Sequence, residues 1–431
     1  MGKVVVYVTG RNPTHGKGGG SSYVRAHMRA AKHAGFTPHV FCIDARNGIS
    51  EEDFGIVHRV VPPFAWRGAV RAQPARRRSR FFADWMASFA ASPYALAVHA
   101  PRLAASIERF LSARAGPHLI HGFYTWSCVG LDVQKRLARK GVEAVVVNSV
   151  YTTARHEARA RMQGAGRESL LRRAVFGAER LWIERVVRRQ ERRAYAESRL
   201  VLLNYESVRT LLFSEHGAGA ETRKSPYSAE TAFLHDGAVP GLLAPTPNAD
   251  APLIVSISRH DPRKGVDVLI RALAALRDAG LRFRACLVSG GPLLASHRRL
   301  ADRLDLTDSV TFTGWVADPY PYLRRADVFV LPSLQEGGGS ISLLEALQAG
   351  VPVIASNVDG IAEDVIDGES ALLVEPGNVD QLARALARAL TDTALRERLC
   401  RRGRQDFAER FSAEAFSSAL AGLYDELGFR A

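Results

Sequence analysis

Short apolar runs alternate with amphipathic segments along the second half of the chain. The runs are a few residues long and end at glycine, proline or polar residues, whereas the amphipathic segments repeat their apolar residues at helical spacing. The predicted strands are Leu253–Ile257, Arg284–Val288, Val310–Thr313, Asp327–Leu331 and Val353–Ala355; the predicted helices are Val266–Ala279, Leu294–Leu304 and Ser342–Ala349, with Asp380–Leu390 and Ser412–Leu427 closing the chain. This alternation predicts a parallel α/β domain.

The first half shows the same alternation less regularly. A strand, Val4–Thr9, leads into a glycine-rich loop ending in Gly18, Gly19 and Gly20, and Ser21 can cap a helix from about Ser22 to Ala34. Further strands are predicted at His39–Ile43, Leu119–Gly122, Glu143–Asn148 and Arg199–Leu203. His121 is then expected at the carboxyl end of its strand, facing the cleft that the sheet borders. The alternative is a structural histidine with satisfied hydrogen bonds.

A break in composition separates the two halves. The segment Asp236–Pro252 carries four prolines among small residues, which is typical of a linker between domains. We therefore predict a first domain over residues 1–238, a linker over 239–252 and a second domain over 253–410. The last segment, 411–431, is predicted to be a helix that crosses back to the first domain.

The composition is that of a globular protein. The chain has 431 residues, of which 47% are hydrophobic and 24% charged, and no apolar run reaches the roughly 20 residues that a membrane span requires. Its four cysteines are scattered, which favours reduced thiols over a disulfide framework or a metal cage. A cytoplasmic protein, peripheral to a membrane at most, is expected.

The net charge of +14 indicates an anionic partner, and the arginines that produce it are clustered. One cluster, Phe64–Trp85, interleaves six arginines with Trp66, Phe81, Phe82 and Trp85. The second, Arg155–Arg199, has thirteen Arg against six Glu and no Asp, and its apolar stripe of Leu181, Trp182, Val186 and Val187 is predicted to face the core. Both clusters suit an anionic or membrane-borne acceptor. The alternative is an Arg-rich surface with no such partner.

The stretch Leu331–Ala355 contains the strongest candidate site. A strand ends in a loop with Glu336, three successive glycines (Gly337, Gly338 and Gly339) and Ser340, and a helix carrying Glu345 follows. Glycines let a ligand approach the backbone closely, and a helix start at the carboxyl end of a parallel strand favours anions and nucleotides. Alternatively, Ser342 and Glu345 form a capping box, which would make Glu345 structural.

Three more strand-to-helix turns of the second domain carry similar residues. The first contains Arg259 and Lys264, which could together neutralise a diphosphate. The second contains Gly290 and Gly291, and the third contains Gly314 and Val316. Several such turns within one domain predict a nucleotide site.

With these motifs the chain resembles the retaining glycosyltransferases of family 4, within the glycosyl transferases of group 1. The resemblance rests on SRHDPRKGVDVLIRAL, VSGGP, VTFTGWV, ADVFVLPSLQEGGGSISLLEALQAGVPVIAS and FSAEAFSSALAGLYDEL, with GGGSSYVRAH near the start. It implies the GT-B fold, in which two Rossmann-like domains face each other across a deep cleft. Two features depart from the family: eight residues rather than seven separate Glu336 from Glu345, and the usual Pro-Asn-Gly is replaced by Pro226-Tyr227-Ser228.

The resemblance also implies roles. Glu345 would bind the ribose, Glu336 and the amides after it the donor sugar, Arg259 and Lys264 the diphosphate, and Gly314–Val316 the base. Gly18–Gly20 would border the reaction centre, and His121 is our own candidate beside it. The implied donor is a UDP- or GDP-linked sugar more readily than an ADP-linked one, used in polysaccharide or glycolipid biosynthesis.

The expected chemistry is retaining transfer without a cofactor or metal, since the sequence has no Asp-x-Asp motif. The alternatives are another GT-B activity, such as an epimerase or phosphorylase, and a non-enzymatic anion-binding protein. A nucleic-acid partner is not expected, because it leaves the glycine turns and both glutamates unused.

Overall fold

The computed structural model describes residues 3–14, 19–61, 96–157, 177–217, 219–225, 227–234 and 251–431. They form two compact units. The first contains the described residues up to 230 together with 416–431, and the second contains the described residues between 231 and 415. Gly18, the cluster Phe64–Trp85 and most of the predicted linker lie outside the described residues.

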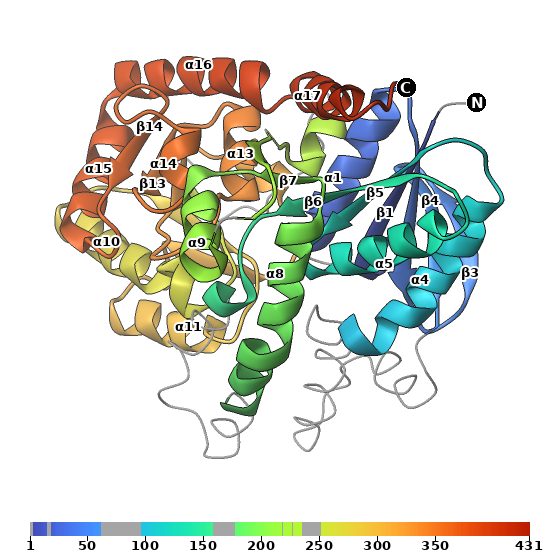
Figure 1. Cartoon of the computed structure of the whole chain (residues 1–431). Helices are drawn as coiled ribbons and strands as arrows, with labels where there is room; N and C mark the ends of the chain where they lie inside the picture. Colours follow the sequence, from blue (N-terminus) through green and yellow to red (C-terminus); the bar gives the residue numbers. More distant parts are fainter. Residues whose placement is uncertain are drawn as a thin grey trace. The chain divides into compact units, whose positions relative to one another are not determined.

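The first unit is built on an eight-stranded sheet with the order β3-β4-β2-β1-β5-β6-β7-β8 (Figure 1). Its strands are β1 (Val4–Arg11), β2 (Thr37–Ile43), β3 (Gly48–Glu52), β4 (Gly55–Val60), β5 (His118–Phe123), β6 (Ala144–Val150), β7 (Leu200–Leu203) and β8 (Thr222–Lys224). Neighbouring strands are parallel, except that β3 runs antiparallel to β4. The central strands are continuous apolar runs because helices cover both of their faces.

Alternate residues of β1 point to opposite faces of this sheet. Val6 and Val8 face a core shared with α4 (Leu96–Ser112) and α5 (Ser127–Ala138). Tyr7 faces the other way and bonds to residues of α1 (Gly19–His33) and α17 (Ala413–Glu426). Figure 1 shows α17, near the C-terminus, beside α1. The last helix is thus part of the first unit's structure from Phe416 onward. The remaining helices of this unit include the π-helical turn η5 (Ile183–Val187), α8 (Arg188–Glu197) and α9 (Glu206–His216).

The second unit has a six-stranded sheet with the order β11-β10-β9-β12-β13-β14, parallel throughout. Its strands are β9 (Leu253–Ile257), β10 (Arg284–Val288), β11 (Val310–Gly314), β12 (Val328–Leu331), β13 (Val353–Ser356) and β14 (Ala371–Val374). Its helices are α10 (Val266–Asp278), α11 (Leu294–Arg303), α12 (Tyr320–Leu323), α13 (Ile341–Ala349), α14 (Ile361–Asp364), α15 (Val379–Thr391) and α16 (Thr393–Arg410). Leu269 and Leu273 of α10 and Leu386 of α15 share one buried core with Ile254 and Val328 of the sheet.

The predicted α/β fold class with two parallel sheets is confirmed, and each predicted strand is found within a few residues of its expected bounds. Two local predictions are wrong. Ser21 does not cap α1, because the helix begins at Gly19 and so includes Gly19 and Gly20 in its first turn. Leu181 and Trp182 do not face the core, since 51% and 38% of their surfaces are exposed.

Candidate functional site

Most of the predicted site residues lie at one edge of the second unit's sheet. Because its strands are parallel, the loops that follow β9, β10, β11 and β12 all leave from the carboxyl edge. The chain continues from β9 to β10 on one side, whereas β12 lies on the other side of β9. The gap between β9 and β12 is therefore a topological switch point, the place where open α/β sheets bind their ligands.

Lys264 and Glu336 meet at this switch point. The Lys264 Nζ atom lies 2.6 Å from Oε1 and 2.5 Å from Oε2 of Glu336. Ser333 donates its hydroxyl to Oε1 at 2.5 Å. The two charged side chains are only 18% and 5% exposed. Two residues that are 72 positions apart in the sequence thus form one nearly buried ion pair.

Backbone contacts hold the two loops together. Gly265 adopts a left-handed conformation with φ of 56°, and a Cβ there would lie 2.0 Å from the carbonyl oxygen of Pro332. Leu334 donates its backbone N–H to the Arg263 carbonyl at 2.7 Å. A side chain at position 265 would push the β9 and β12 loops apart, so glycine is required for the ion pair to form.

Asp359 in the loop after β13 completes this arrangement. Its Oδ2 atom accepts the backbone N–H groups of Glu336 at 2.7 Å and of Gly337 at 2.8 Å. Gly360 in turn donates its N–H to the Gly338 carbonyl at 3.0 Å. Asp359 was not predicted from the sequence, in which the only signal is an Asp-Gly pair shortly after a predicted strand.

The glycine loop ends where α13 begins, at Ser340. This residue has extended backbone angles and is the N-cap, although its hydroxyl bonds to that of Ser342 rather than capping the helix. Glu345 is therefore the fifth helical residue, not the third, and the capping-box alternative is wrong. Glu345 is 9% exposed. Its carboxylate lies close enough to Tyr320 to add to the effect of burial in raising the pKa of that phenol.

Arg259 occupies the same loop as Lys264 but lies in solvent. Its side chain is 62% exposed, and its Nε atom is 3.4 Å from the Asp261 carboxylate. The structure therefore brings Lys264, and not Arg259, onto Glu336.

The turns after β10 and β11 are joined to the β9 loop and to each other. Gly291 has φ of 156°, and a Cβ there would lie 2.5 Å from the His260 carbonyl oxygen. The backbone N–H of His260 donates to the Gly290 carbonyl at 3.0 Å, and the backbone N–H of Ser289 donates to the Gly314 carbonyl at 3.0 Å. Val316 is half-buried, and the neighbouring Trp315 is 54% exposed. No role was predicted from the sequence for this aromatic side chain.

The His260 ring is held by a hydrogen bond to the ring of His297. The Nδ1 atoms of His260 and His297 are 2.8 Å apart, so one ring donates to the other. Burial, with the neighbouring His297, lowers the pKa of His260 to about 4. The pair is uncharged at neutral pH.

His121 does not face a cleft, so that prediction is wrong. Its side chain has no exposed surface. Its ring nitrogens lie 2.6 Å from the Tyr424 hydroxyl and 2.7 Å from the Ser149 hydroxyl. Burial, together with the nearby His27, lowers its pKa well below the usual value. Two further residues of β5 follow His121, and its side chain lies on the sheet face that α1 and α17 cover. This geometry favours the structural alternative.

Of the three glycines predicted on the sugar side, only the last has a described environment. A Cβ on Gly20 would lie 3.7 Å from the Tyr151 hydroxyl, an ordinary van der Waals contact. Gly19 lies with it in the first turn of α1.

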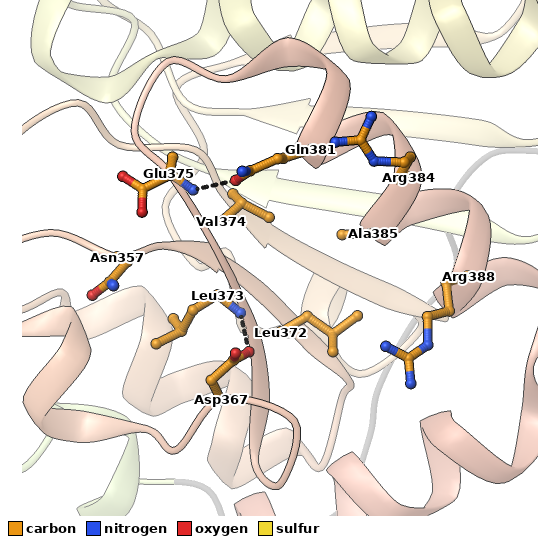
Figure 2. Close-up of a pocket in the computed structure, with 10 residues that line it drawn as sticks. All are labelled: Asn357, Asp367, Leu372, Leu373, Val374, Glu375, Gln381, Arg384, Ala385 and Arg388. Atoms are coloured by element: carbon orange, nitrogen blue, oxygen red, sulfur yellow. Dashed lines mark hydrogen bonds between the residues drawn. The ribbon is translucent and has the colours of Figure 1, made fainter.

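A separate groove of about 490 Å³ lies along β14 and α15 (Figure 2). Asp367 and Gln381 accept the backbone N–H groups of Leu373 and Glu375 at 2.8 and 2.9 Å. Arg384 and Arg388 line the same groove. None of the predicted site residues contributes to it.

In the described part of the chain, no group of three or more His, Cys, Asp or Glu side chains could hold a metal ion. Helices long and apolar enough to cross a membrane are likewise missing among the described residues.

Comparison with known proteins places the same residues in one family. The family model described as "Glycosyl transferases group 1" matches residues 244–406. The lipopolysaccharide core biosynthesis glycosyltransferase LpsE of Rhizobium meliloti (strain 1021) is 36% identical over 175 residues, which are 41% of this chain and 50% of that protein. The chain thus spans about half the length of this relative.

A second relative matches more of its length. The GDP-mannose-dependent alpha-(1-6)-phosphatidylinositol monomannoside mannosyltransferase of Mycobacterium tuberculosis (strain CDC 1551 / Oshkosh) is 33% identical over 275 residues, 61% of this chain and 71% of that protein. Among solved structures, the sucrose-phosphate synthase of Thermosynechococcus elongatus superposes with a TM-score of 0.70 at 22% identity, over 99% of both chains. The fold of the two units is GT-B, as the family resemblance implied.

Proposed function

The chain belongs to the glycosyl transferases of group 1, and from this membership we propose that it transfers a sugar from a nucleotide-diphosphate sugar to an acceptor hydroxyl. The relatives act in lipopolysaccharide core synthesis and on a phosphatidylinositol mannoside. We therefore propose a role in polysaccharide or glycolipid biosynthesis. The UDP- or GDP-linked donor carries the leaving group, and no other cofactor is required.

The observation that carries this proposal is the pairing of Lys264 with Glu336 at the switch point of the second unit. A charged pair that is almost fully buried adds little to stability compared with apolar residues of similar size. Such a pair suits a binding site, because a ligand can replace each of the two side chains as the partner of the other. A diphosphate can take Lys264 while the sugar hydroxyls take the freed Glu336 carboxylate.

The remaining residues fit around this pair. The backbone amides of the glycine loop and the start of α13 can accept a phosphate, because a helix N-terminus carries partial positive charge. Glu345, one turn further along, is assigned to the ribose hydroxyls. Trp315 and the backbone of Gly314 and Val316 are assigned to the base, since an exposed aromatic ring offers a stacking surface.

The proposed reaction retains the anomeric configuration and uses no metal. The acceptor oxygen forms a bond to the anomeric carbon on the face from which the nucleoside diphosphate departs. The anomeric carbon to phosphate oxygen bond breaks, its electron pair stays on the phosphate, and the acceptor's proton passes to that phosphate oxygen. Lys264, with Arg259 moving in from solvent, offsets the charge that develops on the leaving group.

A thermal-shift screen tests the donor. UDP, GDP, ADP and their sugars are added to the full-length protein with and without a chelator, because a ligand that binds only the folded state raises the melting temperature. We expect a UDP or GDP compound to raise it regardless of chelator. The Lys264→Met variant should give a smaller response, whereas Lys135→Met, which removes an exposed pair with Glu197, should respond like the wild type. A response that depends on metal, or none at all, would count against the proposal.

We further propose that the acceptor is anionic or membrane-borne. The helical segment 177–197 exposes Arg180, Arg185, Arg189 and Arg192, with Leu181 and Trp182 beside them. Basic residues with exposed aromatic and aliphatic side chains suit the interface of an anionic bilayer, at about 1 kcal/mol per basic residue.

Liposome flotation tests the membrane part. Binding to anionic vesicles that declines with salt and with Trp182→Ser and Arg189→Ser would support it. The matched control is Arg396→Ser. In the wild type the Arg396 guanidinium donates hydrogen bonds to backbone carbonyls of α15 in the second unit. Absence of flotation at low salt would leave only a soluble anionic acceptor.

A further inference from the structure

A second groove, in the first unit, has a different chemistry from the site described above. It has a volume of about 460 Å³ and lies between the β3–β4 hairpin and α4. Three arginines (Arg59, Arg102 and Arg109), His58 and a set of mostly small or apolar residues line it. No role has been assigned to it so far.

Its arginines come from two elements that face each other. Arg59 is the fifth residue of β4. Arg102 and Arg109 are seven residues apart on α4, and Ala105 and Ser106 lie between them at the spacing of one helix face. A helix face and a strand therefore direct three guanidinium groups towards one groove.

The groove is a packed structure. Gly48 pairs with Arg59 across the hairpin, and a Cβ on Gly48 would lie 3.1 Å from Nη2 of Arg59. The Asn47 Oδ1 atom accepts the backbone N–H of Val61 at 2.9 Å, and Arg102 donates to the Val61 carbonyl at 3.3 Å. The end of β4 is thus held from both sides, and the absence of a side chain at Gly48 leaves room for the guanidinium.

The charged residues among the described lining of this groove are of one sign. Among the described residues that line it there is no carboxylate. His58 adds no charge at neutral pH, because burial and the nearby Arg114 lower its pKa to about 4. The groove of Figure 2 differs in this respect, since Asp367 and Glu375 accompany its arginines. Similar volumes therefore hold a cationic site in one unit and a mixed site in the other.

We propose that the groove between the β3–β4 hairpin and α4 binds a phosphate-bearing ligand. Phosphate oxygens are bound by the guanidinium groups of Arg59, Arg102 and Arg109, whose planar N–H forks match the geometry of phosphate. A phosphate is a better match than a carboxylate, because a carboxylate carries one negative charge and the groove presents three positive ones. Ile49, Val60 and Ala105 cover the uncharged part of the ligand. That this ligand is the acceptor rests on the proposed function; phosphate binding itself does not.

Calorimetric titration with glycerol 3-phosphate tests the site on the full-length protein. Excess UDP or GDP is present in a parallel titration, so that any binding at the loops of the second unit is blocked. We expect binding that persists with nucleotide and weakens at least about tenfold in Arg59→Gln/Arg109→Gln, since each removed guanidinium loses charge-assisted hydrogen bonds. The control Arg384→Gln/Arg388→Gln removes the same charge from the groove of Figure 2 and should bind like the wild type.

The source of the phosphate is separated by a second arm. Vesicles of phosphatidylcholine with phosphatidic acid present the same phosphate as a lipid headgroup. Binding of glycerol 3-phosphate alone indicates a soluble ligand, and groove-dependent binding to the vesicles indicates a lipid. The proposal would be overturned if Arg59→Gln/Arg109→Gln bound the probes as tightly as the wild type, or if Arg384→Gln/Arg388→Gln lost as much affinity as the groove variant. It would also be overturned if the wild type bound neither glycerol 3-phosphate nor the vesicles. A far-ultraviolet circular dichroism melt confirms that the groove variant is folded. The thermal-shift screen of nucleotides reports separately on the proposed function.

Discussion

Replacing Lys264 by Met should separate a structural role of the ion pair from a chemical one. The substitution keeps an unbranched side chain of similar length and removes the charge. Glu336 would then keep the Ser333 hydroxyl as its side-chain partner, while its carboxylate stays 5% exposed. Breaking a buried pair from one side costs about 3 to 5 kcal/mol. The lower figure applies, because the Lys264 side chain is 18% exposed and water can enter.

A loss of about 3 kcal/mol should lower the melting temperature by about 6 to 12 °C in a unit of this size. The exposed pair of Lys135 and Glu197 gives the control, since Lys135→Met should cost less than about 1 kcal/mol. Turnover at saturating donor should fall by about a hundredfold, the usual effect of removing one group that stabilises a developing charge.

The double variant Lys264→Met/Glu336→Gln distinguishes the two effects. It leaves no unpaired charge, so most of the lost stability should return, because a buried ion pair is worth little over a neutral pair. Transfer activity should stay low. Thermal melts and initial rates of sugar transfer measure both quantities. If Lys264→Met melts within about 2 °C of the wild type and keeps its turnover, the reasoning on this pair is wrong.

Three further results are expected. Glu345→Ala should weaken nucleotide-sugar binding by at least about tenfold with little change in melting temperature, consistent with a charged hydrogen bond of about 1.5 to 3 kcal/mol; unchanged binding in a calorimetric titration would remove its ribose role. His121→Ala should lower the melting temperature markedly, because it leaves the Tyr424 and Ser149 hydroxyls without their ring partner, and a stable variant with lost transfer would restore the catalytic prediction. The melting temperature should fall as pH drops from about 6.5 to about 4. Burial lowers the pKa of His27 and His260 to about 4, so between these pH values the unfolded chain binds more protons than the folded one. A melting temperature that stays constant over this pH range would contradict this.

The strands of the second unit could be predicted because they are buried on both faces. Val328–Leu331 and Val353–Ser356 are buried throughout, and apart from the final Ser356 their sequences are continuous apolar runs. The β3–β4 hairpin could not be predicted in this way. Gly48–Glu52 is a sheet edge whose residues are exposed or half-buried, and its polar sequence carries no such run.

The helix α5 was missed for a different reason. Its position Gly130 packs against Ile120, and a Cβ there would lie 2.9 Å from that side chain. Sequence alone treats such a glycine as unfavourable to a helix, whereas close packing against the sheet requires it.

The candidate site was predictable where its residues share one loop and not where distant segments meet. The glycine loop and Glu345 lie in one stretch of sequence. Asp359 holds the amides of Glu336 and Gly337 from the next strand-to-helix loop. Its local sequence offers only an Asp-Gly pair after a strand, which marks a turn but does not indicate this contact. His121 was assigned to a cleft because its partner Tyr424, 303 residues away, cannot be inferred from a strand pattern.

Hydrogen exchange with and without the nucleotide sugar found in the thermal screen tests most directly where the donor binds. Amide exchange should slow in peptides covering 258–265, 289–293 and 332–345, the loops at the carboxyl edge of the second unit's sheet. Peptides covering 371–388, along the groove of Figure 2, should be unaffected. Protection confined to 371–388, or unchanged exchange at 258–265 and 332–345 under saturating ligand, would contradict the assignment of the donor to these loops.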